Sequence, residues 1–497
     1  MSKSPYRWFA VLALTLSATM AGGCGYTSTS ERFVKPYQAG QFDLAAKEVD
    51  DIVGPVQDVN GTDPKELIKV DRRDAIVYRL EQGAILRAAG RLKESSLAFL
   101  NADDIIYEID QKPPVQVSRE VGAAVTNLSF TDYKGYSYDR LALQIYQSLN
   151  YMQLGQLDNA RVALRALQER QEDAEEYFRK QIEALEAKNE GKAADGEKQS
   201  VDVDKVRQDP KVSQAFATAY GDDAILVPDR SAYRKYANPF GEYLQGVYFM
   251  AAALNSSDTE TAATAFKRVK GMLPDNPYVI QDLALAEKVA NGQAVPPTTY
   301  VFFETGQAPL RETIRIDIPI FIINAAAYDT GVDYVGAAFP KLKFRDSFVP
   351  YLSVAANGQA YQTAVLTDMD EVIRTDFNNE LPMVITKTII ATVAKAAIAY
   401  GLNRASEGNV YANLITRIGT TAYQAGLNQA DLRSWETLPK QFQVARFDTP
   451  ADRQLTIALP GGAQLPPITL IDGVVNVVYV KSVQATHTPH VQQFTLK

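Results

Sequence analysis

The sequence contains few cysteines and histidines, the side chains that most often bind transition metals. The 497 residues include one cysteine, Cys24, and two histidines, His487 and His490. A single cysteine excludes a disulfide framework within the chain and a cysteine-based zinc or iron–sulfur site. The two histidines could supply two metal ligands, but Pro489 breaks a helix there and no third ligand is marked. We therefore interpret them as part of an exposed C-terminal tail and expect neither a metal nor a cofactor.

Carboxylates are the remaining groups that could do chemistry. The densest acidic cluster of the C-terminal half is Asp368, Asp370 and Glu371, which lacks the glycine and the ligand spacing of a calcium loop. We interpret it as the first turn of a helix, where the helix dipole favours acidic side chains. Signatures of serine hydrolases, phosphate loops and dinucleotide-binding folds are absent from the sequence. We name no catalytic residue and expect a protein that is not an enzyme.

The first residues have the pattern of a secretory signal. Lys3 and Arg7 precede an apolar stretch at 8–20, and the small residues 21–23 precede Cys24. The apolar stretch is shorter than the roughly 20 residues that a membrane-spanning helix needs. Small residues directly before a cysteine resemble the lipobox of bacterial lipoproteins, in which the cysteine is acylated and becomes the first residue. The resemblance implies a lipoprotein signal peptide at 1–23 and a lipid on Cys24.

The residue after the cysteine and the charge of the chain bear on location. Gly25 follows Cys24, and the sorting rule of such lipoproteins then implies the periplasmic face of the outer membrane of a Gram-negative bacterium. Residues 24–31 are small and polar, which predicts a short flexible lipidated tether. Removing 1–23 takes away two basic residues, so 49 basic and 59 acidic residues remain, a net charge of −10. This charge argues against nucleic acid as a partner. The lipid on Cys24 would be the contact with the membrane.

Four segments of the first half repeat an alternation of small and large residues. They are 40–52, 83–102, 148–167 and 246–274, the last with about four extra residues at 255–258. The alternation resembles the tetratricopeptide repeat, in which small residues let two helices cross closely and large residues fill the gap. Gly40, Gly90 and Gly155 fall where the repeat places its turns. The sequence therefore predicts an N-terminal α-solenoid of tetratricopeptide-like hairpins over 32–290, with a mobile polar segment at about 191–208.

Stacked hairpins of this kind have a concave surface lined by the first helix of each unit. We predict that a periplasmic or outer-membrane protein partner binds to this surface. The predicted contact residues are Leu80, Arg87, Leu149, Gln153, Tyr243 and Val247.

Residues 298–497 change to short β-branched and aromatic runs separated by turn residues. About eight such runs predict an antiparallel, β-sandwich-like C-terminal domain, so the expected fold class is α+β. A helical insertion is expected at about 368–430. Within it, an amphipathic helix at 381–401 begins at Pro382 and ends at Gly401.

This helix has two different faces. The polar face is predicted to hold Lys387, Thr388, Thr392 and Lys395. The apolar face is predicted to hold Ile385, Ile389, Val393, Ala396 and Tyr400. We interpret the helix as packed on the sheet, and a docking surface for a partner or the membrane stays an alternative.

Six segments spread along the chain together resemble one family. They read RDAIVY (73–78), GAILRAAG (83–90), NPFGEYLQG (238–246), ETGQAP (304–309), DLRSWETLP (431–439) and QVAR (443–446). With Cys24, they resemble an uncharacterised family of bacterial outer-membrane lipoproteins that have tetratricopeptide-like repeats and a β-rich C-terminal region. The resemblance implies an outer-membrane lipoprotein facing the periplasm and brings no reaction and no catalytic residues.

These observations favour a non-enzymatic envelope scaffold or adaptor that binds other proteins. One alternative is an assembly or export factor whose helix 381–401 engages an envelope machine. Another is a carboxylate-dependent hydrolase that acts on peptidoglycan or polysaccharide, since any two acids at a suitable separation would suffice.

Replacing Cys24 tests the predicted anchor. Because it is the only thiol of the chain, Cys24→Ser is expected to abolish acylation. Metabolic labelling with a palmitate analogue measures this directly. Undiminished labelling of the variant would contradict the lipoprotein assignment.

Overall fold

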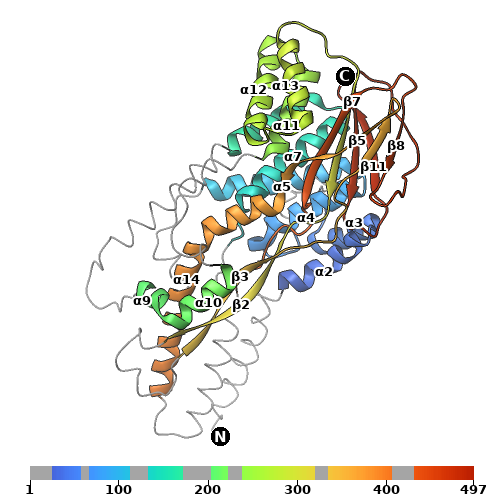
Figure 1. Ribbon diagram of the computed structural model, residues 1–497. Coiled ribbons are helices and arrows are strands. Elements are labelled where there is room, and N and C mark those ends of the chain that lie inside the picture. The colour runs from blue at the N-terminus through green and yellow to red at the C-terminus, as the bar shows by residue number, and fades with distance from the viewer. Residues whose placement is uncertain are drawn as a thin grey trace.

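The computed structural model describes residues 25–56, 67–111, 132–171, 203–221, 238–319, 334–405 and 430–497. It has mixed α+β architecture, with helices in the first half of the chain and β-sheets in the C-terminal region (Figure 1). The predicted signal peptide at 1–23 and Cys24 lie outside the described residues. The helices of the first half are α2 (Gly25–Gln38), α3 (Phe42–Val53), η1 (Arg72–Asp74), α4 (Ala75–Ala88), α5 (Leu92–Asp110), α7 (Ser137–Gln153), a helix at 157–171, α9 (Val203–Gln208), α10 (Pro210–Tyr220), α11 (Pro239–Ala251), α12 (Ser256–Met272) and α13 (Pro277–Ala290).

Successive helices pack as hairpins in which a small residue of one helix meets a large residue of the next. A Cβ atom on Gly83 of α4 would lie 2.5 Å from the ring of Phe99 on α5. A Cβ atom on Gly246 of α11 would lie 2.8 Å from the ring of Phe266 on α12. These contacts confirm the predicted close crossing of the paired helices. The missing side chain lets the aromatic ring lie directly against the neighbouring backbone.

The tight turns between paired helices contain glycines in the left-handed region. Gly40, Gly90 and Gly155 have φ values of 70°, 76° and 71°. Only glycine adopts this conformation routinely, because a Cβ atom would crowd the following carbonyl. The three turns predicted at these glycines are therefore confirmed.

Asparagine or aspartate followed by proline begins three of the helices. Asn238, Asn276 and Asp209 precede the first residues of α11, α13 and α10. Each side chain accepts hydrogen bonds from two backbone N–H groups of the first turn, which have no partner within the helix. Proline at the first helical position has no N–H to satisfy and a φ suited to the helix.

A five-stranded sheet forms the centre of the C-terminal region. Its strands, in spatial order, are β11 (His490–Thr495), β10 (Val475–Ser482), β1 (Thr298–Thr305), β7 (Gln441–Asp448) and β6 (Ala364–Asp368). Strand β1 is parallel to β10 and antiparallel to β7. The expected purely antiparallel arrangement is therefore wrong at the sheet centre. The expected C-terminal tail is an edge strand at residues 490–495, where it pairs with β10, although His490 at its start is exposed as expected.

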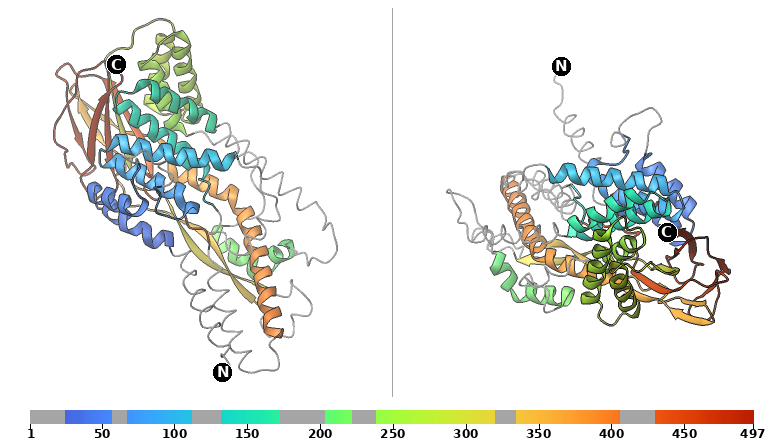
Figure 2. Two further views of the ribbon diagram at one scale, coloured as in Figure 1. Left: turned by 180° about the vertical axis from the view of Figure 1, so that it is seen from behind. Right: turned by 90° about the horizontal axis from the view of Figure 1, so that it is seen from above.

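Two smaller sheets complete the β-structure of the described residues. One has the order β5 (Gln359–Gln362), β4 (Ser353–Ala356), β8 (Gln454–Ala458) and β9 (Ile468–Thr469). The other is a ribbon of β2 (Leu310–Pro319) and β3 (Tyr334–Lys343). The ribbon extends away from the central sheet together with α14, as two further views show (Figure 2).

The central strand is covered on both faces. All eight residues of β1 are buried. Tyr300, Phe302 and Glu304 face the helices, where Tyr300 and Phe302 contact the ring of Tyr243 and Glu304 accepts a hydrogen bond from Tyr146. On the opposite face the hydroxyl of Thr299 is hydrogen-bonded to that of Thr449, and the hydroxyl of Thr305 donates to the carbonyl of Val349. Burial on both sides explains why the strand is a continuous run rather than an alternation of polar and apolar residues.

The helical insertion differs from its prediction at both ends. Helix α14 spans Met369–Ala405, so Pro382 lies inside it and Gly401 does not end it. The helix begins where Asp368 accepts a hydrogen bond from the N–H of Asp370, which confirms the acidic cluster as a first turn. Pro382 is accommodated because its missing N–H costs only one hydrogen bond of a long helix that packs on β3.

The faces of α14 are partly as predicted. Ile385 and Ile389 of the predicted apolar face are fully buried. Thr388 and Thr392, which were predicted to lie on the polar face, are buried as well. The threonine face is therefore covered as well, which the helical wheel does not reveal. The side chains of Val393, Lys395, Ala396 and Tyr400 lie outside the described part of the structure. No helix in the described ranges combines the length and hydrophobicity needed to cross a membrane.

Two predicted loose segments are helical where they are described. Residues 25–31, expected as a tether, belong to α2, and Tyr26 is 95% buried, with 5% of its surface exposed. Of the polar segment 191–208, residues 203–208 form α9, and the rest lies outside the described residues. Both segments are polar in sequence but are held by tertiary contacts, for example a hydrogen bond from Arg207 to the hydroxyl of Thr386 on α14.

Adding a methyl group to Gly83 tests the close helix crossing. We expect Gly83→Ala to lower the free energy of unfolding by about 1–3 kcal/mol, because the methyl group would overlap the ring of Phe99. The matched control is Gly271→Ala on α12, where a Cβ atom would meet no atom within 4 Å. This control is expected to be neutral or to stabilise by about 0.5–1 kcal/mol. Equal urea midpoints for the two variants would contradict the crossing.

Candidate functional site

The surface predicted to bind a partner is covered by the chain itself. Leu80, Leu149, Tyr243 and Val247 have no exposed surface, and Arg87 keeps only 4% of its surface. Gln153 is partly buried and donates a hydrogen bond to Gln492 of β11. The prediction that a second protein contacts these residues is therefore wrong for this structure. Their apolar pattern correctly indicates a buried face, but it is the C-terminal region of the same chain that packs against this face.

An extended segment, 430–438, runs along this inner face of the helices, and we call it the threaded segment. Its Trp435 is 1% exposed and packs against two rings that stack on each other, with centroids 5.8 Å from Phe99 of α5 and 5.7 Å from Tyr146 of α7. The indole N–H donates to the hydroxyl of Thr437 at 2.9 Å. A large aromatic residue buried in this way contributes several kcal/mol to the contact between helices and sheet.

Helices α2 and α4 satisfy the backbone of the threaded segment. The carboxylate of Glu81 accepts hydrogen bonds from the N–H groups of Glu436 and Thr437 and from the Thr437 hydroxyl at 2.6 Å. The hydroxyl of Tyr26 donates to the carbonyl of Ser434 at 2.7 Å, and that of Tyr37 to the carbonyl of Thr437 at 3.1 Å. A segment without strand partners can be buried only if its polar groups are paired in this way.

Ion pairs hold the start of the threaded segment. Arg433 is 4% exposed, and its guanidinium lies 2.8 Å from Asp74 and 2.6 Å from Asp431. At the other end the carbonyl of Leu438 accepts a hydrogen bond from the N–H of Ala308. Two segments of the family resemblance, 73–78 and 304–309, thus contact opposite ends of a third, 431–439.

A second buried polar cluster surrounds Glu304 on β1. Its carboxylate accepts hydrogen bonds from the hydroxyls of Tyr479 at 2.5 Å and Tyr146 at 2.8 Å, and it pairs with Lys481. Glu304 and Lys481 are direct neighbours in the parallel register of β1 and β10. Burial alone would raise the pKa of Glu304, but Lys481 and the two tyrosines hold this pKa below its usual value. Glu304 is therefore ionised at neutral pH, whereas burial lowers the pKa of Lys481.

A third cluster links α13 to the sheet. The carboxylate of Asp282 lies 3.1 Å from the hydroxyl of Tyr300 and 3.2 Å from the Arg446 guanidinium, and it also accepts a hydrogen bond from Tyr243. Burial raises the pKa of Asp282 to about 6, while Arg446 and the tyrosines act in the opposite direction. This cluster is closed by its own partners and has a structural role.

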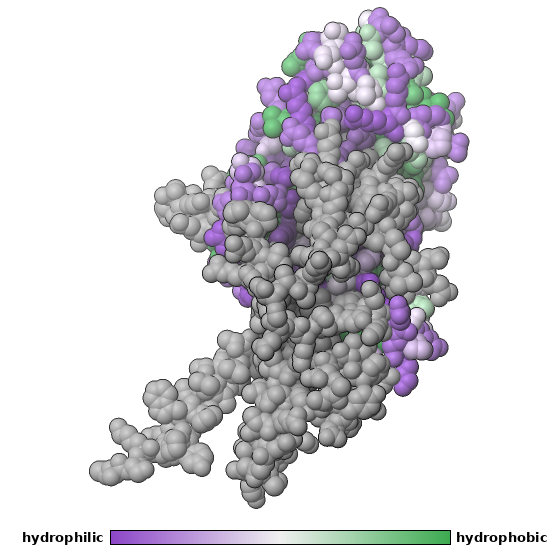
Figure 3. Space-filling model, turned by 90° about the vertical axis from the view of Figure 1, so that its left-hand side faces the viewer, coloured by the Kyte–Doolittle hydropathy of each residue, from purple (hydrophilic) through white to green (hydrophobic). Residues whose placement is uncertain are grey.

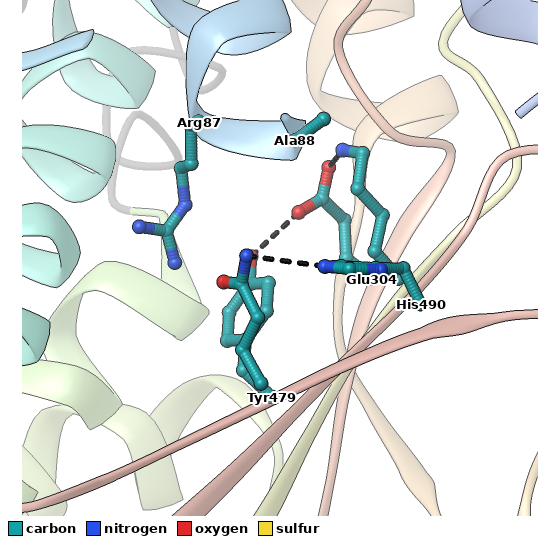
Figure 4. Close-up of a pocket in the computed structure, with 7 residues that line it drawn as sticks. Arg87, Ala88, Glu304, Tyr479 and His490 are labelled. Carbon is teal, nitrogen blue, oxygen red and sulfur yellow. Dashed lines mark hydrogen bonds and ion pairs between the residues drawn. The ribbon is translucent and has the colours of Figure 1, made fainter. Parts of the chain in front are cut away.

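The Glu304 cluster opens into a small pocket between α4, β10 and β11 (Figure 4). The lining residues are Arg87, Ala88, Glu304, Tyr479, Lys481, His490 and Gln492. The space amounts to about 250 Å³ with its open mouth included. Burial and the nearby Lys481 lower the pKa of His490, so its imidazole is neutral at neutral pH. The arrangement is suited to binding a small polar group.

Sequence reasoning found part of this pocket. Arg87 is one of the residues predicted to contact a partner, because it lies on the first helix of a hairpin. Gln153, another of these residues, donates a hydrogen bond to the pocket residue Gln492. Glu304, Tyr479 and Lys481 were missed as a group, because only the parallel pairing of β1 with β10 brings them together. His490 was noticed as a chemical group but was assigned to a tail. Within the described ranges, no three histidine, cysteine or acidic side chains are grouped so that they could hold a metal ion.

The chain was also compared with known proteins. No protein-family model, curated protein sequence or solved structure that was compared with the chain matches it.

Glu81 is expected to make stability depend on pH. Burial and the neighbouring Glu436 raise its pKa from 4.5 to about 8. The unfolded chain then releases this proton at a lower pH than the folded protein, so stability falls as the pH rises from about 4.5 to 8. Between pH 6 and 8 we expect a loss of up to about 1.4 kcal/mol per pH unit, which Glu81→Gln removes.

The measurement is the slope of the free energy of unfolding against pH, from urea titrations. The matched control is Glu260→Gln on α12, an exposed acid that should leave the slope unchanged. An unaltered slope in Glu81→Gln would contradict the raised pKa of this carboxyl group.

Proposed function

We propose that the protein is a lipid-anchored scaffold that holds a protein partner close to the periplasmic face of the outer membrane. The observation that carries this proposal is the start of α2 at Gly25, the residue after Cys24. Tyr26 and Ser30 of α2 bond to Ser434 and Glu436 of the threaded segment. The residues next to the anchor are thus part of the folded core.

Such an anchor would set the distance between the membrane and the protein. One residue of extended chain spans at most about 3.6 Å, so a lipid on Cys24 would keep the start of α2 at the lipid headgroups. A flexible tether of many residues would instead let the body move away from the membrane. The geometry therefore favours a partner that is itself at the membrane surface.

We further propose that the hairpins are tetratricopeptide-like and that the chain belongs to the lipoprotein family that its sequence resembles. The pairs Gly83–Phe99 and Gly246–Phe266 support the repeat. The contacts of 73–78 and of 304–309 with 431–439 support the family, since distant segments that contact one another are expected to be retained together.

The partner would contact the outer surface of the helices, because the inner face is covered. Large apolar side chains exposed there include Leu100 and Tyr107 of α5, Val162 of the helix at 157–171 and Leu254 before α12. Figure 3 shows that the described surface around α11–α13 is mainly hydrophilic with scattered apolar residues. Scattered residues of this kind provide positions from which a partner can be crosslinked without disturbing the core.

Site-specific crosslinking in intact cells tests the scaffold. A photoreactive amino acid placed at Leu100, Tyr107, Val162 or Leu254 is expected to give a discrete protein adduct from at least one position. The matched control is Leu80, which is fully buried and should give no adduct with another protein. The adduct is expected to disappear in the Cys24→Ser form, since that form would leave the membrane.

Two results would contradict the proposal. If none of the four exposed positions gave an adduct, the proposed role as a scaffold would be contradicted. An adduct of equal yield in a Cys24→Ser form recovered from the soluble fraction would show that the membrane anchor does not position the partner.

A further inference from the structure

The guanidinium of Arg87 is a buried positive charge without a counter-ion. Arg87 is 4% exposed and donates one hydrogen bond, from Nη1 to the side-chain oxygen of Asn150 at 2.6 Å. Its central carbon lies 4.7 Å from the centre of the Tyr479 ring. Among the described residues, no carboxylate is within ion-pair distance of Arg87, and its buried Nη2 has no hydrogen-bond partner. An unpaired buried charge is costly and calls for an explanation.

Other arginines buried to the same degree have carboxylate or carbonyl partners within the protein, although Nε of Arg79 and of Arg311 makes no hydrogen bond among the described residues. Arg311 faces Glu380 at 3.0 Å, and Arg433 faces Asp74 and Asp431. Arg79 has no carboxylate in contact but donates to the carbonyls of Gly54 and Pro55. Arg87 differs from all three because it lines an open pocket.

The charges of the pocket do not cancel. Lys481 is matched by Glu304, whose two oxygens are already occupied by Lys481, Tyr146 and Tyr479. The imidazole of His490 is neutral at neutral pH, and the side chain of Gln492 is uncharged. Arg87 therefore leaves one positive charge uncompensated, and a ligand with one negative charge would complete the site.

The mouth of the pocket adds polar groups to this charge. The amide nitrogen of Gln492 lies 3.3 Å from Nε2 of His490, and its oxygen accepts a hydrogen bond from Gln153. Figure 4 shows the end of Arg87 on one side of Tyr479, with His490 and the Glu304 carboxylate on the other. The enclosed part of the pocket has room for about one water molecule and is open to solvent, so only the oxygens of a small ligand would enter it while the rest of the ligand lies at the mouth.

We propose that this pocket binds a small free oxyanion of carboxylate or phosphate type, held by the Arg87 guanidinium with the Gln492 amide at its edge. Guanidinium groups prefer such planar or tetrahedral oxygen anions because their N–H groups match the spacing of the oxygens. The site lies between the helices and the sheet, so an ion bound there would stabilise that contact. This inference is independent of the lipid anchor and of the proposed scaffold.

Calorimetric titration of the full lipidated protein in detergent tests the proposal, with sodium phosphate and sodium acetate as separate probes and sodium chloride as the reference at equal ionic strength. We expect saturable binding of phosphate or acetate and a rise in the melting temperature. Binding of phosphate alone assigns a phosphoryl-type site, and binding of acetate alone assigns a carboxylate site. A response equal to that in chloride would overturn the proposal, since the pocket would then hold only water.

Two variants identify the residues. Arg87→Met keeps the length of the side chain and is expected to weaken binding by about 10- to 100-fold. Without added ion, it should melt no lower than the parent, because it removes an unpaired buried charge. Gln492→Glu places a carboxylate at the pocket, so it should raise the melting temperature and abolish the response to the probes.

The matched control is Arg268→Met, which removes a half-exposed arginine of α12 that pairs with Glu242. It should bind the probes as the parent does. Unchanged binding in Arg87→Met would overturn the assignment of the site. If Arg87→Met failed to fold, Gln492→Glu would still decide, because full binding in that variant would also overturn it.

Discussion

The burial of the threaded segment against the inner face of the helices is the contact on which the rest of the structure depends. Trp435 packs against the stacked rings of Phe99 and Tyr146, and Glu81 pairs the backbone N–H groups that would otherwise be buried without partners. These groups come from α4, α5, α7 and the chain just before β7. Without this contact, the hairpins would expose an apolar face and the central sheet would lose its cover.

The same contact joins the two halves into one core. Strand β1 is buried on both faces, and its even-numbered residues meet α7 and α11. Helix α2 is held by the threaded segment at three hydroxyl groups, those of Tyr26, Ser30 and Tyr37. A lipid before α2 would therefore be connected to the sheet through hydrogen bonds rather than through a flexible tether.

Buried polar groups at this junction fall into two kinds. Asp282 and Arg433 are closed by their own partners and hold elements together. Around Arg87, the protein leaves one charge unmatched beside an open pocket. Because an unpaired buried charge costs more stability than a paired one, this asymmetry supports the proposed binding site at Arg87.

Some properties of the protein could be derived from the sequence alone because they depend on local rules. Glycines at 40, 90 and 155 predict turns through their backbone freedom, and Gly83 with Phe99 predicts a close crossing through size. The β-rich texture after residue 298 and the acidic first turn at 368–371 were likewise predictable. Each of these depends on residues that are near in the chain.

The tertiary structure alone decided what covers each apolar face. The pattern of Leu80, Leu149 and Val247 requires a buried face, but hydrophobic burial is non-directional, and a partner or the chain itself would satisfy it equally. The start of α14 was misplaced because Pro382 suits a first turn and is also tolerated inside a long packed helix. The pocket at Arg87 needs the parallel pairing of β1 with β10, and such long-range pairing leaves no local signal in either strand.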